Sequence, residues 1–438
     1  MITPQNSRRA PALTTAPAAA DGPPPPAGQP GAARGVIIAL LLLLFLGLLD
    51  VQILSPILPG LAVSFQTTIA AMGIAVTVYA AAASACALVI GPLSDYFGRL
   101  PFLRWAALLF TLAAAGAWLA PAFPFYLAAR LLAGLAGGVI SAAVIAQMAD
   151  SFPYESRGRA MGWIGAMYFA AAVVGVPAGA LLAGSWGWRA LYLVLAGAAG
   201  ALTVCLFALR AIKTPRAQAA TAQAEGANDW RLLPVVTGQI RAYSHYWRAP
   251  RTRQGLLLAL AVSATTSLLL TYLGVWLSAR FGMSTAEIGL VFLLTGLAAT
   301  ITALTGGWWA DRFGKRRVII LSSAMLVVVL PLLAHVTTLV QLYLLCAAGG
   351  MLLAVREGPF QALSTEVVPV QERGAFLALR NFTSQLAIAA SAAAGGVLYQ
   401  AFGFRAICFA AAGSSALALI AAARLSLRAQ SHTGWKRA

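Results

Sequence analysis

The chain has 438 residues, of which 60% are hydrophobic and only 10% are charged, and its formal net charge is +18. A soluble protein carries roughly 25% charged residues, so this composition excludes a soluble globular protein and predicts one that crosses a membrane many times. The positive charge does not indicate nucleic acid, because it collects on one side of the predicted spans. The exceptions among the 30 Lys and Arg are three in outer segments and three in spans: Arg189, Arg280, Arg405, Arg130, Arg356 and Arg380.

In chain order, residues 1–34 are rich in Pro, Ala and Gly and predict a disordered tail that is retained. Six spans of about 20 mostly apolar residues follow in residues 35–210, and six more in 254–425, before a short tail at 426–438. Their expected bounds are 34–58, 69–91, 101–121, 124–149, 160–184, 189–209, 254–279, 286–309, 317–335, 338–362, 374–400 and 404–424. The sequence therefore predicts an all-α polytopic membrane protein.

The segment between the halves, residues 211–253, is a long basic linker. Val236, Ile240, Tyr243 and Trp247 recur at i, i+4, i+7 and i+11, which places an apolar stripe on one helix face. This spacing predicts an amphipathic helix lying on the membrane surface. A binding site for a partner protein is the competing interpretation.

An even number of spans places both termini on one side of the membrane. Because Lys and Arg are enriched in cytoplasmic loops, that side is predicted to be the cytoplasm. Arginine far outnumbers lysine and alanine is abundant, a bias typical of GC-rich bacterial genomes. We therefore expect a multi-pass protein of the bacterial inner membrane, in contact with its lipids.

A short signature occurs twice in the chain, 216 residues apart. It runs from Gly91 through Asp95 and Gly98 to Arg99, and again from Gly307 through Asp311 and Gly314 to Lys315. Further pairs keep the same offset: Arg157-Gly158 with Arg373-Gly374, Trp186-Gly-Trp-Arg189 with Phe402-Gly-Phe-Arg405, and Gly197 with Gly413. Self-similarity at one fixed period predicts two copies of one fold unit.

The chemistry of the signature suggests a gate on the cytoplasmic side. Gly91 and Gly307 would let helices approach closely, and Gly98 and Gly314 would permit positive φ in a tight turn. Each aspartate can accept backbone N–H groups or pair with a nearby base. The expected bases are Arg99 or Arg157 in the first half and Lys315 or Arg373 in the second. Contacts that break when the inner side opens would form a two-state latch; the alternative is that these are turn and topology signals only.

Two charges are predicted deep in the membrane near the outer face. Asp50 lies in the first span and Arg130 in the fourth, both about 9–14 Å below the outer surface at 1.5 Å per residue, so they can meet. An ionisable group at such depth is by default a functional hypothesis. We expect the pair to couple transport to protons; a static structural ion pair is the alternative.

Other candidates are less specific. Glu357, next to Arg356, is either a second protonatable acid or half of a salt bridge at the cytoplasmic mouth. Gly175, Pro177 and Gly179 give the fifth span a smooth, bendable face for packing against the other half. Polar and aromatic side chains that could line a substrate path are Tyr79, Tyr168, Thr266, Tyr272 and Trp276, although a Thr in a membrane helix often bonds to its own backbone.

Metal and cofactor sites are not predicted. The four cysteines lack metal-ligand spacing, and no phosphate-binding Gly-x4-Gly-Lys-Ser/Thr loop occurs. A membrane-embedded enzyme would need His, Asp or Cys clustered at one depth, whereas His245, His335 and His432 are scattered. The few charges in the spans also argue against a charged substrate.

With its doubled signature and two six-helix halves, the chain resembles the major facilitator superfamily, and most closely its drug/proton antiporter branch. The resemblance covers roughly residues 35–425. Supporting motifs are Arg130-x3-Gly134-x3-Gly138, Gly175-Val-Pro177-Ala-Gly179, Trp188-Arg189 and Ala286-Glu-Ile-Gly289.

This resemblance implies twelve helices in two pseudo-repeats that rock around a central site, with no cofactor. It implies a monomer that exports small, mostly apolar compounds in exchange for protons. The alternatives are uptake of a sugar or another metabolite and, in a different class, a transport-dead sensor.

Overall fold

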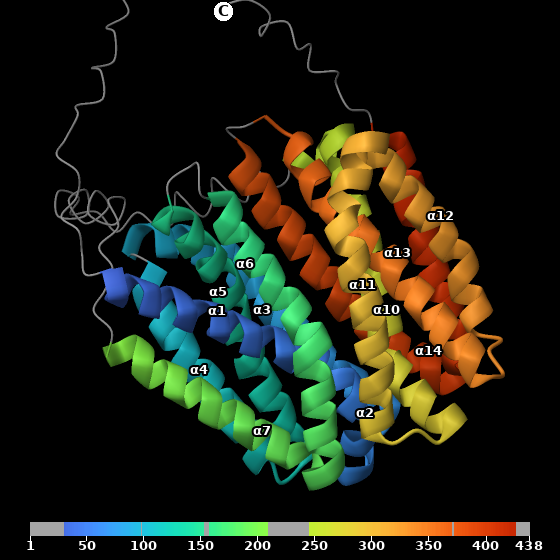
Figure 1. Ribbon diagram of the computed structural model, residues 1–438, viewed down its shortest axis with the longest axis horizontal. Coiled ribbons are helices and arrows are strands. Elements are labelled where there is room, and N and C mark those ends of the chain that lie inside the picture. Colours follow the sequence, from blue (N-terminus) through green and yellow to red (C-terminus); the bar gives the residue numbers. More distant parts are fainter. Residues whose placement is uncertain (1–29, 98, 153–156, 209–244, 370–371, 426–438) are drawn as a thin grey trace, which may run out of the picture.

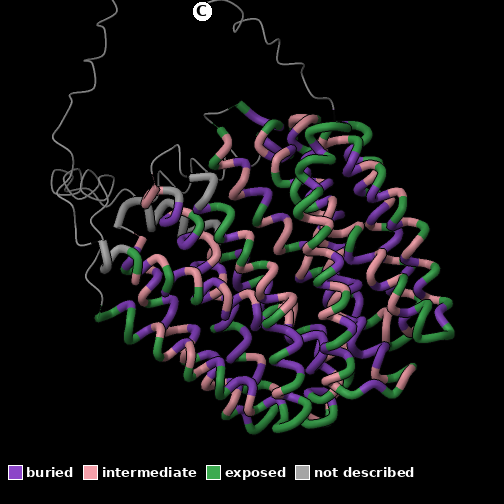
Figure 2. The backbone as a smooth tube through the Cα atoms, in the orientation of Figure 1, coloured by how far each residue is buried: buried purple, intermediate pink, exposed green. Residues whose placement is uncertain are grey.

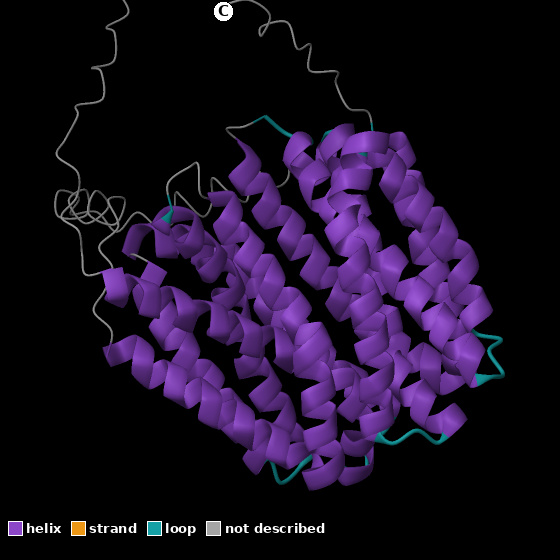
Figure 3. Cartoon of the chain, viewed as in Figure 1, coloured by secondary structure: helices purple, strands orange, loops and turns teal. Residues whose placement is uncertain are grey.

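The computed structural model describes residues 30–97, 99–152, 157–208, 245–369 and 372–425, which form helices joined by short turns, with no strand among them (Figures 1 and 3). The first group of helices comprises α1 (Pro30–Gln52), α2 (Leu54–Ser64), α3 (Ile69–Phe97), α4 (Arg99–Leu119), α5 (Phe123–Ser151), α6 (Arg157–Ala170), the π-helix η2 (Ala171–Gly175) and α7 (Val176–Ala208). The second comprises α10 (Pro250–Phe281), α11 (Thr285–Phe313), α12 (Lys315–Leu333), α13 (Leu339–Glu366) and α14 (Arg373–Arg424). Figure 1 shows the two groups as two halves lying side by side.

Among the residues that the structure describes, ten helical segments are long and apolar enough to cross a membrane. Two of them, residues 160–208 and 373–424, contain two crossings each, because a glycine with positive φ interrupts the helix. Gly187 has φ +83° and Gly403 has φ +71°, a conformation that costs glycine little. These two glycines are related by the 216-residue repeat. The described residues thus contain twelve crossings, and the predicted fold class is confirmed.

The surface of the bundle is apolar. Exposed residues run along most of the helices (Figure 2), and many are large hydrophobic side chains, including Leu119, Val204, Leu304 and Leu321. Exposed apolar surface of this extent is abnormal for a soluble monomer. It fits a surface that faces lipid.

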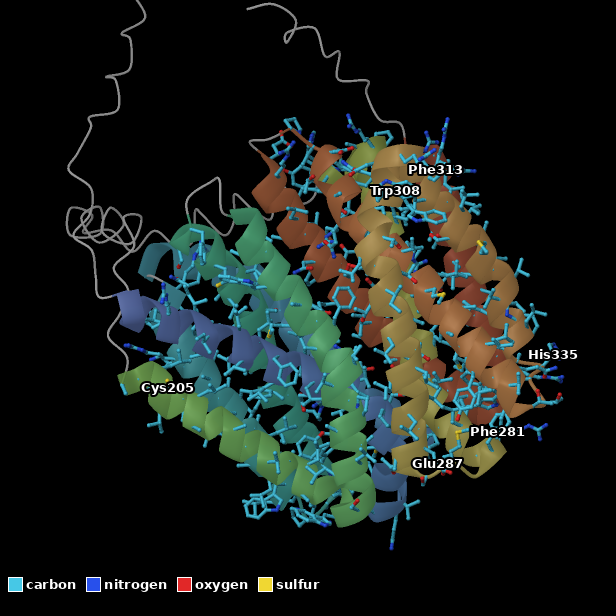
Figure 4. The ribbon with its side chains drawn as sticks, viewed as in Figure 1. Cys205, Phe281, Glu287, Trp308, Phe313 and His335 are labelled. Carbon is cyan, nitrogen blue, oxygen red and sulfur yellow. The ribbon has the colours of Figure 1, made fainter. Side chains whose placement is uncertain are left out.

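The two ends of the bundle can be told apart by the repeated elements. We call the end at which α3 and α11 finish, at Phe97 and Phe313, the signature end, and the end that carries Gly187 and Gly403 the turn end. Figure 4 shows Trp308 and Phe313 at the signature end and Phe281 and Glu287 at the opposite end. There, α11 starts with a capping box in which Ser284 and Glu287 exchange hydrogen bonds.

The two halves meet through repeat-related glycines. A Cβ at Gly73 of α3 would lie 2.7 Å from the carbonyl oxygen of Ala392 in α14, and one at Gly289 of α11 would lie 2.6 Å from the Cβ of Ala180 in α7. Gly73 and Gly289 are 216 residues apart. The two main interfaces between the halves, α3 with α14 and α7 with α11, therefore use the same device.

The contacts between the halves lie toward the turn end. Ser55 Oγ of α2 donates to the carbonyl of Thr271 in α10 at 3.4 Å, and Thr77 Oγ1 of α3 donates to the carbonyl of Ala389 in α14 at 2.8 Å. Toward the signature end, an added Cβ at Gly165 of α6 or Gly307 of α11 would meet no atom within 4 Å. The bundle is thus held together at the turn end.

The first crossing is broken at Ile53, three residues after Asp50. Pro56 lacks the N–H that would bond to the carbonyl of Gln52, which accounts for the break. The helix then resumes and runs to Ser64, beyond the expected end at residue 58. Pro59 lies inside α2 and does not end it. Helix α1 begins at Pro30, and its apolar span begins at Arg34, as expected.

Several predicted segments lie largely or wholly outside the described residues. They include the N-terminal tail up to residue 29, the tail at 426–438 and most of the predicted interfacial helix. Of that helix, Trp247 is exposed, and Tyr246 packs against Phe376 of α14 with ring centroids 5.8 Å apart.

Candidate functional site

Asp50 of α1 and Arg130 of α5 form a buried ion pair. Arg130 Nη1 donates to Asp50 Oδ1 at 2.8 Å and to Oδ2 at 2.7 Å. The two residues are only 3% and 2% exposed. The structure therefore brings together the two charges whose depths were expected to match.

Aromatic side chains enclose this pair. The Arg130 guanidinium lies 4.6 Å from the ring centroid of Tyr79, within the range of a cation–π interaction. Behind it, the hydroxyls of Tyr126 and Tyr192 are hydrogen-bonded at 2.8 Å. Arg130 Nε is buried and has no hydrogen-bond partner among the described residues. The pair is thus almost dry, and its charges depend on each other.

The glycines that follow Arg130 account for this placement. A Cβ at Gly134 would lie 2.3 Å from the carbonyl oxygen of Tyr79, and a Cβ at Gly137 would lie 2.1 Å from its hydroxyl. At Gly138 the same atom would lie 2.6 Å from the carbonyl of Ala83. The glycine face of α5 therefore allows α3 to approach closely and holds Tyr79 against Arg130.

At the signature end, each half has an ion pair that joins the start of one helix to the end of another. Arg99 of α4 pairs with Asp150 of α5 at 3.0 Å, and Lys315 of α12 pairs with Glu366 of α13. Arg99 and Lys315 are related by the 216-residue offset, and so are Asp150 and Glu366. The repeat therefore extends to both partners of this pair.

This arrangement corrects the expected pairing in the second half. Asp311 is exposed and no described residue forms an ion pair with it, while Lys315 bonds to Glu366 instead. The predicted partner Arg373 forms no ion pair among the described residues either, and its Nε has no hydrogen-bond partner there. Gly314, at φ +90°, ends α11 and starts α12 in a new direction. Asp311 and Lys315 are therefore not i, i+4 neighbours on one helix.

The glycines of the signature have mixed outcomes. The positive φ predicted for Gly314 is confirmed, whereas the close approach predicted at Gly307 is wrong, because an added Cβ there meets nothing within 4 Å. Gly91 and Asp95 belong to α3, and Arg157 is the first residue of α6. Gly98 lies outside the described residues.

The fifth crossing contains the π-helix η2 just before Pro177. Because the proline ring would clash with the carbonyl four residues earlier, a wider turn just before it relieves the strain. Gly175 and Gly179 pack within their own half, against Leu49 and Ile53 respectively. The expectation that they contact the other half is therefore wrong; Pro177 and Ala180 contact Gly289 there instead.

The candidate substrate-path residues divide into packed and open ones. Tyr272 is buried and its hydroxyl donates to the carbonyl of Ala392, while Trp276 stacks on Phe404 with centroids 4.4 Å apart. Thr266 donates to the carbonyl of Val262 in its own helix at 3.1 Å. Of the five candidates, Tyr168 of α6 is the exposed one, at 42%, while Tyr79 lies buried beneath Arg130.

Arg356 and Glu357 do not form a salt bridge. The carboxylate of Glu357 accepts a hydrogen bond from Gln361 Nε2 at 2.7 Å, and Gln361 Oε1 accepts one from Arg380 Nη1 at 2.7 Å. The sequence did not single out Gln361, Arg380, Asp150 or Glu366 as site residues. The fixed offset could have identified Asp150 and Glu366, because both copies are acidic.

The described residues contain no group of three or more His, Cys, Asp or Glu placed to hold a metal ion. What the site provides is one compensated pair of charges in the first half and a hydrogen-bonded polar chain in the second. Both lie at membrane depth, where an ionisable group can exchange a proton or hold a polar ligand once water or solute reaches it.

Comparison with known proteins covers both halves. A family model described as Major Facilitator Superfamily matches residues 40–284 and 255–438. The uncharacterized MFS-type transporter YwfA of Bacillus subtilis is 25% identical over 357 residues, which are 81% of this chain and 83% of that protein. The efflux pump dotC of Dothistroma septosporum is 29% identical over 172 residues, 39% of this chain and 30% of that protein. A solved bacterial homologue of the human lysosomal transporter Spinster, inward-facing and unoccupied, has a TM-score of 0.68 at 15% identity, with coverage of 91% of this chain and 95% of that one.

Proposed function

Because the chain belongs to the major facilitator superfamily, a family of secondary transporters of small molecules, we propose that it exports small, mostly apolar compounds in exchange for protons. The observation that carries this proposal is the ion pair of Asp50 and Arg130. It is the one ion pair among the described residues that lies away from the signature end, deep inside the spans. Similarity over part of the chain to an efflux pump supports the direction of transport.

The transport cycle follows from the contacts between the halves. On the arginine distribution, the signature end faces the cytoplasm, and the closed turn end faces outward. Rocking the halves would break the contacts of Ser55, Gly73 and Gly289 and open the outer side. Hydration of Asp50 in that state would let it take up a proton, and its return to Arg130 would release the proton inward. Substrate and proton drive the cycle by binding the two states with different affinities.

We further propose that the protein lies in the bacterial inner membrane and works as a monomer. Its partners would be a small-molecule substrate and protons. Each half has its own buried core, and the ion pair of Asp50 and Arg130 lies wholly within the first half. No second copy is needed to complete it.

The test is transport of a broad panel of labelled compounds by the full chain in proteoliposomes with an imposed proton gradient. We expect substrate export that depends on the imposed proton gradient. Asp50→Asn should abolish this export. Glu372→Gln, which removes an exposed acid at the start of α14, serves as the matched control and should transport normally. Since Asp50→Asn leaves Arg130 unpaired, the double variant Asp50→Asn/Arg130→Gln restores charge balance and should fold but not couple.

The outcome also separates the alternatives. Substrate uptake in the same direction as proton flow, instead of export in the opposite direction, would indicate a symporter of a metabolite. If Asp50→Asn left gradient-driven transport unchanged, the proposed coupling would be wrong. If no compound moved with the wild-type protein, a sensor would become the better interpretation.

A further inference from the structure

The second half contains three charged residues at membrane depth that the ion pair of the first half does not explain. Arg356 and Glu357 lie nine or ten residues before the end of α13 at Glu366, and Arg380 lies seven residues after the start of α14. At 1.5 Å per residue this is about 10–15 Å from the signature end. We call Arg356, Glu357 and Arg380 the second-half charge cluster.

Arg356 has almost no compensation. It is 1% exposed, and its one hydrogen bond runs from Nη2 to the carbonyl of Val262 in α10 at 3.5 Å, longer than a good hydrogen bond. Its Nε and Nη1 are buried and find no partner in the part of the chain that the structure describes. A buried guanidinium in this condition is costly unless an anion joins it.

Arg380 is also buried, at 7% exposure. One edge of its guanidinium is satisfied by the Gln361 side chain and one face by the ring of Phe360, whose centroid is 5.2 Å away. Its Nε has no hydrogen-bond partner among the described residues. The Gln361 amide separates Arg380 from Glu357, so the carboxylate does not neutralise this arginine by direct contact.

The charges in the spans do not balance. In the first half, Asp50 and Arg130 cancel, whereas the second-half charge cluster has two guanidiniums and one carboxylate. One positive charge is left over, and it has no counter-ion among the residues described. A single negative charge brought in by a ligand would complete the cluster.

The second-half charge cluster is open toward the first half. Glu357 and Gln361 are exposed, and Tyr168 of α6, on the opposite half, lies near both Glu357 and Arg380. The cluster therefore borders the space between the halves, on the side that the turn-end contacts do not close.

The repeat separates this cluster from the shared moving parts. The positions 216 residues before Arg356, Glu357 and Arg380 are Ile140, Ser141 and Ile164, all uncharged. By contrast, the ion pairs at the signature end and the glycines between the halves occur in both copies. A feature present in only one half is better explained by what the protein carries than by how it moves.

We propose that Arg356 and Arg380, with Glu357 tuning their charge, bind the one negative group of an otherwise apolar organic anion such as a carboxylate. Tyr168, which is 42% exposed, supplies aromatic surface for its apolar body. This proposal rests on the transport function proposed above and names its substrate class: mostly apolar compounds carrying a single negative charge.

The test is equilibrium binding to the full chain in phosphatidylcholine nanodiscs at constant ionic strength. The probes are benzoate, 2-naphthoate and decanoate, each beside its uncharged amide, and chloride. We expect saturable binding of at least one carboxylate, with its amide at least about tenfold weaker. Arg356→Gln and Arg380→Gln should each weaken carboxylate binding at least about tenfold, while Glu357→Gln should strengthen it, because the net positive charge rises.

The controls separate binding from folding and from coupling. Arg253→Gln removes an exposed arginine near the start of α10 and should leave binding unchanged, and Arg356→Lys keeps the charge and should retain most of it. Binding of the amides or chloride as strong as that of the carboxylates, or no carboxylate binding at all, would overturn the proposal. So would a well-folded Arg356→Gln protein with unchanged affinity. Asp50→Asn should lose proton coupling yet still bind the anion, so each proposal can fail without the other.

Discussion

Gly274 of α10 packs against Ser55 of α2 where the halves meet, and replacing it with alanine should push them apart at the turn end. A Cβ there would lie 2.3 Å from the backbone carbonyl oxygen of Ser55 in α2. That carbonyl cannot accept the usual i+4 hydrogen bond of its own helix, because Pro59 has no N–H to donate to it. The obstacle is backbone and not a flexible side chain, so it cannot move aside on its own.

The magnitude follows from the missing space. Restoring an ordinary contact requires the two segments to separate by about 1 Å. Overpacking of this kind costs about 1–3 kcal/mol, and it acts only on the conformation in which the turn end is closed. A penalty of about 2 kcal/mol shifts the ratio of the closed to the open conformation about thirtyfold toward the open one.

The assay is a distance measurement between two spin labels by double electron–electron resonance. Spin labels go on cysteines introduced at Ser185 and Ala401, repeat-related exposed positions in the two halves at the turn end, with the four native cysteines replaced by alanine. Gly274→Ala should increase the population with the longer distance. Gly307→Ala, where an added Cβ meets nothing within 4 Å, is the matched control. An unchanged distribution in folded Gly274→Ala, or an equal shift in the control, would refute the reasoning.

Two further predictions concern stability, both measured by thermal unfolding of the purified protein. Gly134→Ala should lower the free energy of unfolding by about 2–3 kcal/mol, because its Cβ would lie 2.3 Å from the carbonyl oxygen of Tyr79. Gly162→Ala, with no neighbour within 4 Å, should raise the free energy of unfolding slightly. Equal effects of the two substitutions would contradict the packing argument. Asp150→Asn should destabilise the protein more than Glu366→Gln, because the Arg99–Asp150 pair is more buried (11% and 17% exposed side chains) than the Lys315–Glu366 pair (33% and 40%). Exposed ion pairs contribute only roughly 0–1 kcal/mol. The reverse order of stabilities would contradict this reasoning.

The sequence predicts the features that depend on order along the chain. The repeat fixes two copies of six crossings, and counting residues along each helix is enough to match the depths of Asp50 and Arg130. Gly187 and Gly403 were aligned by their offset alone, and the structure explains that alignment by their positive φ.

Features that depend on which way a helix faces could not be predicted. Helices apolar on every side give no periodic signal for their buried face, so nothing in the sequence distinguished the packed Tyr272 and Trp276 from the exposed Tyr168. The preference of Lys315 for Glu366 over Asp311 depends on the direction α12 takes after Gly314. The incomplete pairing of Arg356 depends on the chain around it in three dimensions.

The π-helix Ala171–Gly175 makes the two copies differ in rotation even though they agree in length. The repeat offset is the same before it, at Arg157 and Arg373, and after it, at Gly187 and Gly403, while the equivalent residues of α14 are ordinary α-helix. A π turn takes more residues to complete than an α turn. Helix α6, which lies between the π-helix and the signature end, is therefore rotated about its own axis relative to the repeat-related first part of α14. Tyr168 belongs to that rotated stretch, so its side chain and that of the repeat-related Ser384 leave their helices in different directions. One local change of helical pitch therefore lets two halves of equal length present different side chains to the space between them.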